Sequence, residues 1–146
     1  NWFTPASFGS EIQGMLAIGA IDSGSNARCS FSNYNTTRVE MGAPGCNGLF
    51  ATVPGNSYQS MQGTSMASPV AAGAAALAFG LVASRTNADP TPAVVEEIMK
   101  AGSRVESGLT RWFREGRTVD LVALATEVDK RYPASGGANP PPDCTP

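Results

Sequence analysis

GTSMASP, at residues 63–69, leads into a run of alanine, glycine and larger apolar residues that continues to residue 83. A turn of small residues before such a run predicts a helix over residues 65–83. Ser65 then lies in the first helical turn, where backbone N–H groups lack partners within the helix and attract negative charge. Because the run is apolar nearly all round, we expect this helix to be buried on most faces.

The composition is that of a compact globular chain. Its 146 residues are 42% hydrophobic and 15% charged, with a formal net charge of −2. Lysine and arginine are scattered along the sequence, which argues against a nucleic-acid partner. The apolar run has no basic flank or aromatic belt, and Ser68 and Pro69 interrupt its start. We therefore expect a core helix rather than a membrane span, and no membrane partner.

Short apolar segments that end at turn residues predict strands. We expect a buried strand at residues 15–21, a second at 38–43 that stops at Pro44-Gly45, a third at 49–53 and a brief one at 57–61.

Two further helices are expected after the long one. Thr91 as N-cap, Pro92 at the first helical position and Gly102 just past the end predict a helix over 92–101, with Glu96 and Glu97 on its solvated face. Residues 108–116 are expected to form a loop, and residues 119–132 a helix or a short strand and a helix.

Three cysteines are present: Cys29, Cys46 and Cys144. Cys29 and Cys46 are close enough in sequence for a local disulfide, and two buried, reduced cysteines are the alternative. Cys144 lies in the segment 133–146, which is rich in proline and glycine and predicts a tail or linker. The spacing of the cysteines indicates no zinc site.

Several blocks of the sequence, in the right order, resemble the subtilisin-like serine peptidases, or subtilases. Residues 17–22 (AIGAID) resemble the family's VGAVD-like strand, 30–34 (SFSNY) and 39–45 (VEMGAPG) its SFSNYG and APG segments, and 63–73 its GTSMASPHVAG nucleophile helix. The resemblance implies an α/β fold, namely part of the three-layer subtilisin-like fold with a mainly parallel sheet and a buried central helix. It implies that residues 1–132 are the C-terminal portion of a peptidase domain.

The same resemblance assigns roles around the serine. Ser65 matches the nucleophile, and its own N–H would be one oxyanion donor. Gly63, Thr64 and Met66 would be its substrate-binding or oxyanion neighbours, with Thr64 positioning the nucleophile and Met66 shielding the site. Val70 stands where the family commonly has histidine, which removes any polar contact expected there.

No histidine is present to activate Ser65, and a serine hydroxyl is a poor nucleophile without a base beside it. In the family, the catalytic His, the catalytic Asp and the oxyanion Asn all precede the matched region, and Asp22 matches only a structural turn position. The resemblance therefore implies an N-terminal portion of the same peptidase as partner. Lys100 and Lys130 are remote in sequence, which argues against a Ser–Lys mechanism.

The leading hypothesis is thus one portion of a secreted serine endopeptidase that cleaves peptide bonds in protein or peptide substrates through an acyl-enzyme on Ser65. A non-catalytic subtilase-like scaffold or binding module is one alternative, and the intact GTSMASP motif argues against it. A sedolisin-type peptidase, which pairs serine with Glu and Asp, is the other, and the continuation after Ser65 fits subtilases better.

We expect no cofactor and no metal site. Some subtilases place an acid near a weak cation site at the position of Glu40, but hard cations need several oxygen ligands and this stretch offers one acid. No structural calcium is therefore assigned, and Glu40 is expected to be a solvated carboxylate on a strand. Asn35-Thr36-Thr37 matches the N-glycosylation pattern, which we treat as a chance match.

Overall fold

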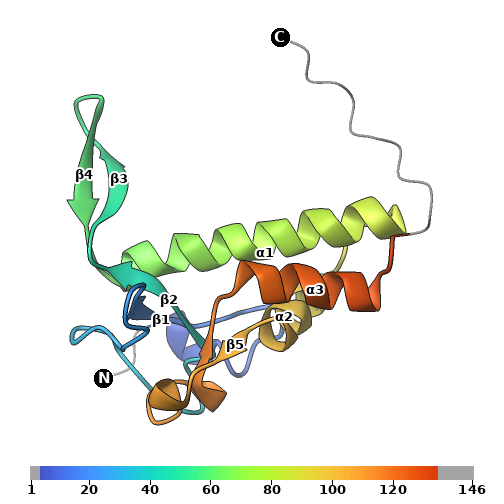
Figure 1. Ribbon diagram of the computed structural model, residues 1–146, viewed down its shortest axis with the longest axis horizontal. Helices are drawn as coiled ribbons and strands as arrows, with labels where there is room; N and C mark the ends of the chain where they lie inside the picture. Colours follow the sequence, from blue (N-terminus) through green and yellow to red (C-terminus); the bar gives the residue numbers. More distant parts are fainter. Residues whose placement is uncertain (1–3, 135–146) are drawn as a thin grey trace.

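A computed structural model describes residues 4–134 of the chain (Figure 1). A short 3-10 turn at Ala6–Phe8 comes first. The regular elements that follow are β1 (Ile18–Asp22), β2 (Met41–Cys46), β3 (Leu49–Val53), β4 (Ser57–Met61), α1 (Thr64–Thr86), α2 (Pro92–Ala101), β5 (Arg104–Val105), β6 (Arg117–Thr118) and α3 (Leu121–Arg131), with 3-10 turns at Ser107–Leu109 and Arg114–Gly116 between β5 and β6. The segment from residue 135 onward, which includes Cys144 and most of the expected tail, lies outside the described residues.

The strands form one mixed sheet and one separate hairpin. The sheet has the order β1-β2-β6-β5, with β1, β2 and β6 parallel and the two-residue β5 antiparallel to β6. Strands β3 and β4 pair only with each other and project from the body beside the start of α1 (Figure 1). The predicted α/β class and mainly parallel sheet are confirmed.

Strand β2 corrects the expectation that a strand stops at Pro44-Gly45. It begins three residues later than predicted and continues through both residues to Cys46, pairing with β1 along its length. Gly45 is needed for close approach rather than for a turn. A Cβ there would lie 2.5 Å from the Ala20 Cβ and 3.0 Å from the Ala67 Cβ. Glycine thus lets the start of α1 rest on the end of the sheet.

Helix α1 is longer than predicted, and it is less buried. It lies across β1 and β2 and packs against α2 and α3 (Figure 1). Its buried residues form one stripe: Ala67, Ala71, Ala74, Ala78 and Val82. On the other faces, Leu77 and Phe79 are about two-fifths exposed. The expected burial on most faces is therefore wrong for the described residues, because the sheet, α2 and α3 all contact the same side.

By length and composition alone, α1 would also qualify as a membrane-spanning helix, with a mean hydropathy of 1.8. The same test is passed by core helices of soluble proteins. The packing of its buried stripe on the sheet is what a core helix requires.

The two shorter helices follow their capping residues. The Thr91 side chain accepts a hydrogen bond from the Val94 N–H at the start of α2, and Gly102 ends that helix. Asp120 caps α3 in the same way, after the short strand β6. Glu97 is exposed as expected, whereas Glu96 is mostly buried because it accepts from the Gly14 N–H and pairs with Lys100. This carboxylate ties the segment before β1 to α2.

The face of the sheet opposite α1 is covered by the segment between β5 and β6. Phe113 is fully buried there, in a cluster with Ile21, Val39 and Leu109. Its ring lies directly over two glycines of the sheet, Gly19 and Gly42. The expected loop at 108–116 is therefore a structural layer that supplies a core aromatic residue.

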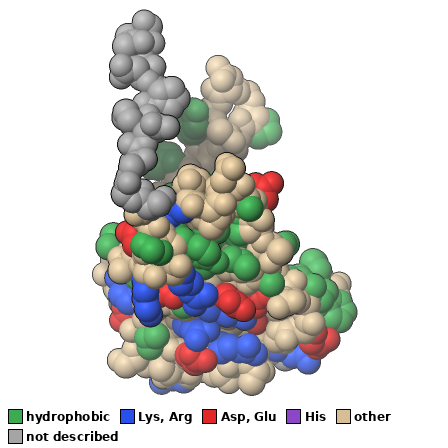
Figure 2. Space-filling view, turned by 90° about the vertical axis from the view of Figure 1, so that its right-hand side faces the viewer, with side chains coloured by type: hydrophobic (Ala, Val, Ile, Leu, Met, Phe, Trp, Pro, Cys, Tyr) green, Lys and Arg blue, Asp and Glu red, His purple; other side chains and the backbone are tan. Residues whose placement is uncertain are grey.

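Charged side chains of both signs are interleaved on the face shown in Figure 2. Ion pairs join the helices to one another, with Arg85 to Asp129 between α1 and α3 and Arg131 to Glu97 between α3 and α2. This face therefore offers no continuous basic surface of the kind that binds nucleic-acid phosphates.

Gly19→Ala should destabilise the protein by about 1–3 kcal/mol, because the new methyl group would overlap the Phe113 ring, which has no room to move. Gly108→Ala is the matched control, since nothing lies within 4 Å of its Cβ position. Urea unfolding of the two variants measures the difference. Equal stability of the two variants would contradict the packing of Phe113 on the sheet.

Candidate functional site

The turn that carries Ser65 is fixed by backbone contacts to the sheet. The Gly63 N–H donates to the Gly45 carbonyl over 2.7 Å, which joins the turn to the end of β2. Gly63 precedes α1 with φ 153° and ψ 164°, a conformation that residues with a side chain rarely adopt. The Gly63 carbonyl then accepts from the Met66 and Ala67 N–H groups and starts the helix. The glycine of the motif is therefore required by the backbone geometry.

Ser65 lies in the first turn of α1 and is exposed. Within the described residues, its hydroxyl has no hydrogen-bond partner, and the Thr64 and Ser65 N–H groups have no backbone acceptor. Pro69 has no N–H and cannot donate to the Ser65 carbonyl one turn below it. A hydroxyl and two unpaired donors are thus presented together at a helix N-terminus, an arrangement that stabilises developing negative charge.

Small buried residues support this turn from beneath. Ala20, Ala43, Ala67 and Ala71 form one buried cluster together with a disulfide between Cys29 and Cys46. The predicted local disulfide is therefore confirmed. The cluster lets α1 approach the sheet closely, so the position of Ser65 depends on backbone contacts rather than on long side chains.

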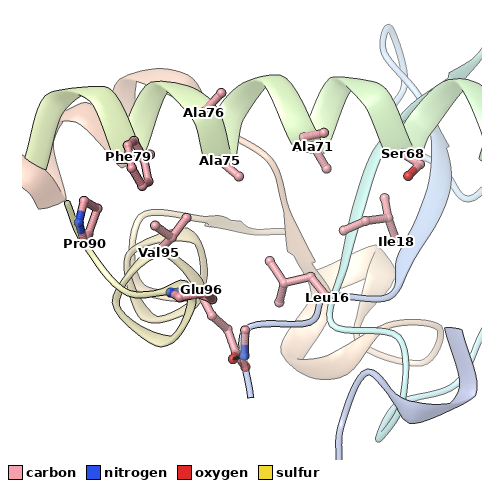
Figure 3. A pocket seen from close by; sticks show the side chains of 13 residues that line it. Leu16, Ile18, Ser68, Ala71, Ala75, Ala76, Phe79, Pro90, Val95 and Glu96 are labelled. Carbon is pink, nitrogen blue, oxygen red and sulfur yellow. Dashed lines mark hydrogen bonds between the residues drawn. The ribbon is translucent and has the colours of Figure 1, made fainter. Parts of the chain in front are cut away.

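An apolar groove runs along α1 from Ser68 to Phe79 (Figure 3). It has a volume of about 550 Å³ and lies between α1, α2 and the segment that enters β1. Its walls include Leu16, Ile18, Ala75, Phe79 and Val95. Ser68 faces the end of the groove nearest the start of α1 (Figure 3). Apolar surface of this kind is often found at interaction or ligand-binding sites of proteins.

Gly63, Thr64, Ser65 and Met66 lie together at the start of α1, as their adjacency requires. Ser68 was not predicted from the sequence as a site residue. Its spacing of three residues from both Ser65 and Ala71 places the three on neighbouring positions of one helix face.

Asp22 is the turn residue that the sequence predicted. Its carboxylate accepts from the Gly24 and Ser25 N–H groups and from the Ser25 hydroxyl. The hydrogen bonds from Ser25 hold the pKa of Asp22 below its ordinary value.

Residues 2–116 match the sequence profile of the subtilase family. The chain belongs to the subtilase family. Similar subtilases include a thermophilic serine proteinase of Bacillus sp. (strain AK1), 38% identical over 115 residues, which are 79% of this chain and 25% of that protein. Subtilisin DY of Bacillus licheniformis is 51% identical over 63 residues, 43% of this chain and 22% of its own length.

Solved structures agree on the subtilase fold. The prenylagaramide maturation protease PagA superposes with a TM-score of 0.68 at 22% identity, over 86% of this chain and 45% of its own. A cold-adapted subtilisin-like serine proteinase superposes with a TM-score of 0.64 at 26% identity, over 79% of this chain and 38% of its own. The chain thus spans about a quarter of the length of the curated subtilases and less than half of these solved structures.

The described part of this subtilase contains no group of three or more histidine, cysteine or acidic side chains placed to hold a metal ion. Glu40 lies at the position where some subtilases place an acid near a weak cation site. It is 0% exposed, so the expectation of a solvated carboxylate is wrong. Its Oε2 accepts from the Ala17 N–H over 3.0 Å. Its Oε1 has no hydrogen-bond partner among the described residues and lies 4.0 Å from Arg114 Nη1.

Burial raises the pKa of Glu40 above its ordinary value, against the opposing effects of the Ala17 N–H and the Arg114 charge. The folded subtilase therefore holds this proton more tightly than the unfolded chain does. As the pH rises past the ordinary value of 4.5, the unfolded state loses the proton first, so ionisation of Glu40 progressively lowers stability.

Glu40→Gln removes this titration. The stability of the variant relative to the natural protein should rise between pH 4 and pH 7, since only the natural protein loses stability by ionising residue 40. Urea unfolding at several pH values in this range gives the two curves. A constant difference between them would contradict the raised pKa.

Proposed function

We propose that this chain is the C-terminal portion of a secreted subtilisin-like serine endopeptidase and supplies the nucleophile Ser65. The substrate is a protein or peptide, and the reaction is hydrolysis of a peptide bond through an acyl-enzyme. The observation that carries the proposal is an exposed serine, in the motif GTSMASP, beside unpaired N–H groups at the start of α1. Residues 1–132 belong to the peptidase domain in this proposal.

The chemistry divides between this chain and an N-terminal portion. The Ser65 Oγ attacks the carbonyl carbon of the scissile bond while its proton passes to a histidine of that portion, which an aspartate orients. The Ser65 N–H and an asparagine of that portion donate to the oxyanion. Collapse expels the amine, which takes the proton from the imidazolium, and water then hydrolyses the acyl-enzyme by the same route.

Three features support an N-terminal portion as partner. The chain has no histidine to act as the base. The faces of α1 that carry Leu77 and Phe79 are uncovered, and the groove beside Ser68 is unfilled among the described residues. Covering such apolar surface stabilises an assembly by about 25 cal/mol per Å².

The outer edge of the sheet supports the same partner. Strand β1 is an edge strand among the described residues. The loop that follows it bonds to its second half, where Ala20 and Asp22 use both their N–H and their carbonyl groups. The first half of β1 is therefore open for pairing with another strand, which natural proteins rarely leave exposed.

Family membership favours this function over a sedolisin-type peptidase. Of the four similar proteins described above, three are named proteases or proteinases and the fourth is a subtilisin, which supports a peptidase activity. A non-catalytic scaffold would present the same fold without reactivity at Ser65, so a test of reactivity separates the two.

A fluorophosphonate probe should label Ser65 only when the N-terminal portion is present, because the chain alone lacks a base to take the serine proton. Mass spectrometry of the labelled peptide locates the probe. Ser65→Ala in the natural protein should abolish labelling and lower kcat for a peptide substrate by at least about a thousand-fold.

Ser84→Ala is the control, since Ser84 lies on the same helix and bonds only to the Leu81 carbonyl. Absence of labelling both with and without the N-terminal portion would favour the scaffold. Rapid labelling of the isolated chain would show that the base lies within these residues and would overturn the division of the chemistry.

A further inference from the structure

The Cys29–Cys46 disulfide lies under the turn that carries Ser65. Cys46 is the last residue of β2, and its Cα lies 6.3 Å from that of Cys29. Cys29 is nearly fully buried, and its N–H donates to the Ala20 carbonyl of β1 over 3.0 Å. The disulfide therefore fastens the end of β2 to the loop that borders β1.

The residue next to Cys46 is the one that touches the serine turn. The Gly45 carbonyl accepts from the Gly63 N–H over 2.7 Å, and a Cβ at Gly45 would lie 2.9 Å from the Gly63 carbonyl oxygen. Ala67, one turn into α1, belongs to the same buried cluster as the two cysteines. A shift of the end of β2 would therefore be transmitted directly to the backbone around Ser65.

The β3–β4 hairpin separates the end of β2 from the turn that carries Ser65. The chain leaves the sheet after Cys46, runs out through the hairpin and returns at Met61, four residues before Ser65 (Figure 1). Both strands pair only with each other, and Phe50 and Tyr58 are 77% and 71% exposed. The hairpin itself contributes little to hold the turn. Its first end is fixed by the pairing of β2 with β1 and by the disulfide, and its second end by the Gly63–Gly45 hydrogen bond.

We propose that the Cys29–Cys46 disulfide is a positioning group for the nucleophile, which keeps the Ser65 turn in its reactive geometry. This inference rests on the proposed function of Ser65. A misplacement of about 1 Å at a reacting atom can lower a rate about a hundred-fold. Reduction by a dithiol gives the Cys29 and Cys46 thiols and converts the dithiol to its cyclic disulfide, so a reducing environment switches the activity off.

The test uses the natural protein with Cys29→Ser and Cys46→Ser combined, at a temperature where circular dichroism shows it fully folded. The double variant should react with a fluorophosphonate at Ser65 about 10- to 100-fold more slowly, and kcat should fall in parallel. KM for a peptide substrate should stay within about two-fold, because the loss lies in the chemical step. Reduction of the natural protein with dithiothreitol should give the same loss, and reoxidation should restore the rate.

Val128→Ala is the matched control. Val128 is fully buried in α3, in the cluster that does not contain the cysteines, so its truncation lowers stability without touching the serine turn. It should lower the melting temperature and leave the labelling rate unchanged. A second control treats the double variant with dithiothreitol. Because this variant lacks Cys29 and Cys46, any change in its labelling rate arises elsewhere, for example at Cys144.

The outcomes separate this inference from the proposed function. Labelling that persists in Ser65→Ala would overturn the proposed function itself. Loss of labelling in Ser65→Ala together with a natural rate in the folded double variant would overturn the positioning role alone. Global unfolding of both the double variant and the reduced natural protein would also overturn it, because the disulfide would then hold the whole fold rather than the turn.

Discussion

The close approach between the start of α1 and the ends of β1 and β2 is the constraint on which the structure depends. Gly45 has no side chain to separate the two elements, and Ala20 and Ala67 meet across the space that remains. The Gly63 N–H to Gly45 carbonyl hydrogen bond closes the contact. Larger residues at these positions would lift the helix from the sheet. The position of Ser65 therefore depends on the small residues that lie between the start of α1 and the sheet.

The sequence was sufficient wherever local chemistry decides the structure. The ends of α2 follow from Thr91, Pro92 and Gly102, and the strands expected at 49–53 and 57–61 are found at those positions. The cysteine pair was predicted from short separation alone. In each case the residues that determine the feature lie within about 20 positions of one another, so single-chain patterns contain the information.

The wrong predictions concern residues whose environment comes from distant parts of the chain. Pro44-Gly45 is typical of a turn, but pairing with β1 and contact with α1 keep it in a strand. Glu40 was assigned to solvent because carboxylates usually are, and it is buried against Ala17 and Arg114. Tertiary contacts override local preference at such positions, and no pattern in the neighbouring residues reports them.

The composition of helix α1 predicts more burial than the described residues provide. A helix that is apolar all round is expected to be buried all round, yet α1 buries one stripe against the sheet, α2 and α3. The sequence predicts burial on all faces, yet Leu77 and Phe79 are exposed. The proposed N-terminal portion would account for this difference if it covered these side chains. The chain also spans less than half of the solved structures that share its fold. The apolar outer faces of α1 are thus the sequence feature that points most directly to the proposed partner.

The same division applies to the chemistry of Ser65. A helix start supplies N–H donors from its own backbone, so the backbone donor of an oxyanion site needs only a turn of small residues and can be encoded within GTSMASP. The second donor proposed above, an asparagine side chain, comes from the N-terminal portion. A proton acceptor is different, because it must be a side chain held beside the hydroxyl and no backbone group can replace it. Local sequence can therefore specify the serine that would carry the acyl group and the backbone donor that would stabilise the oxyanion. The base of the proposed mechanism therefore depends on a packed contact with the N-terminal portion rather than on the sequence around Ser65.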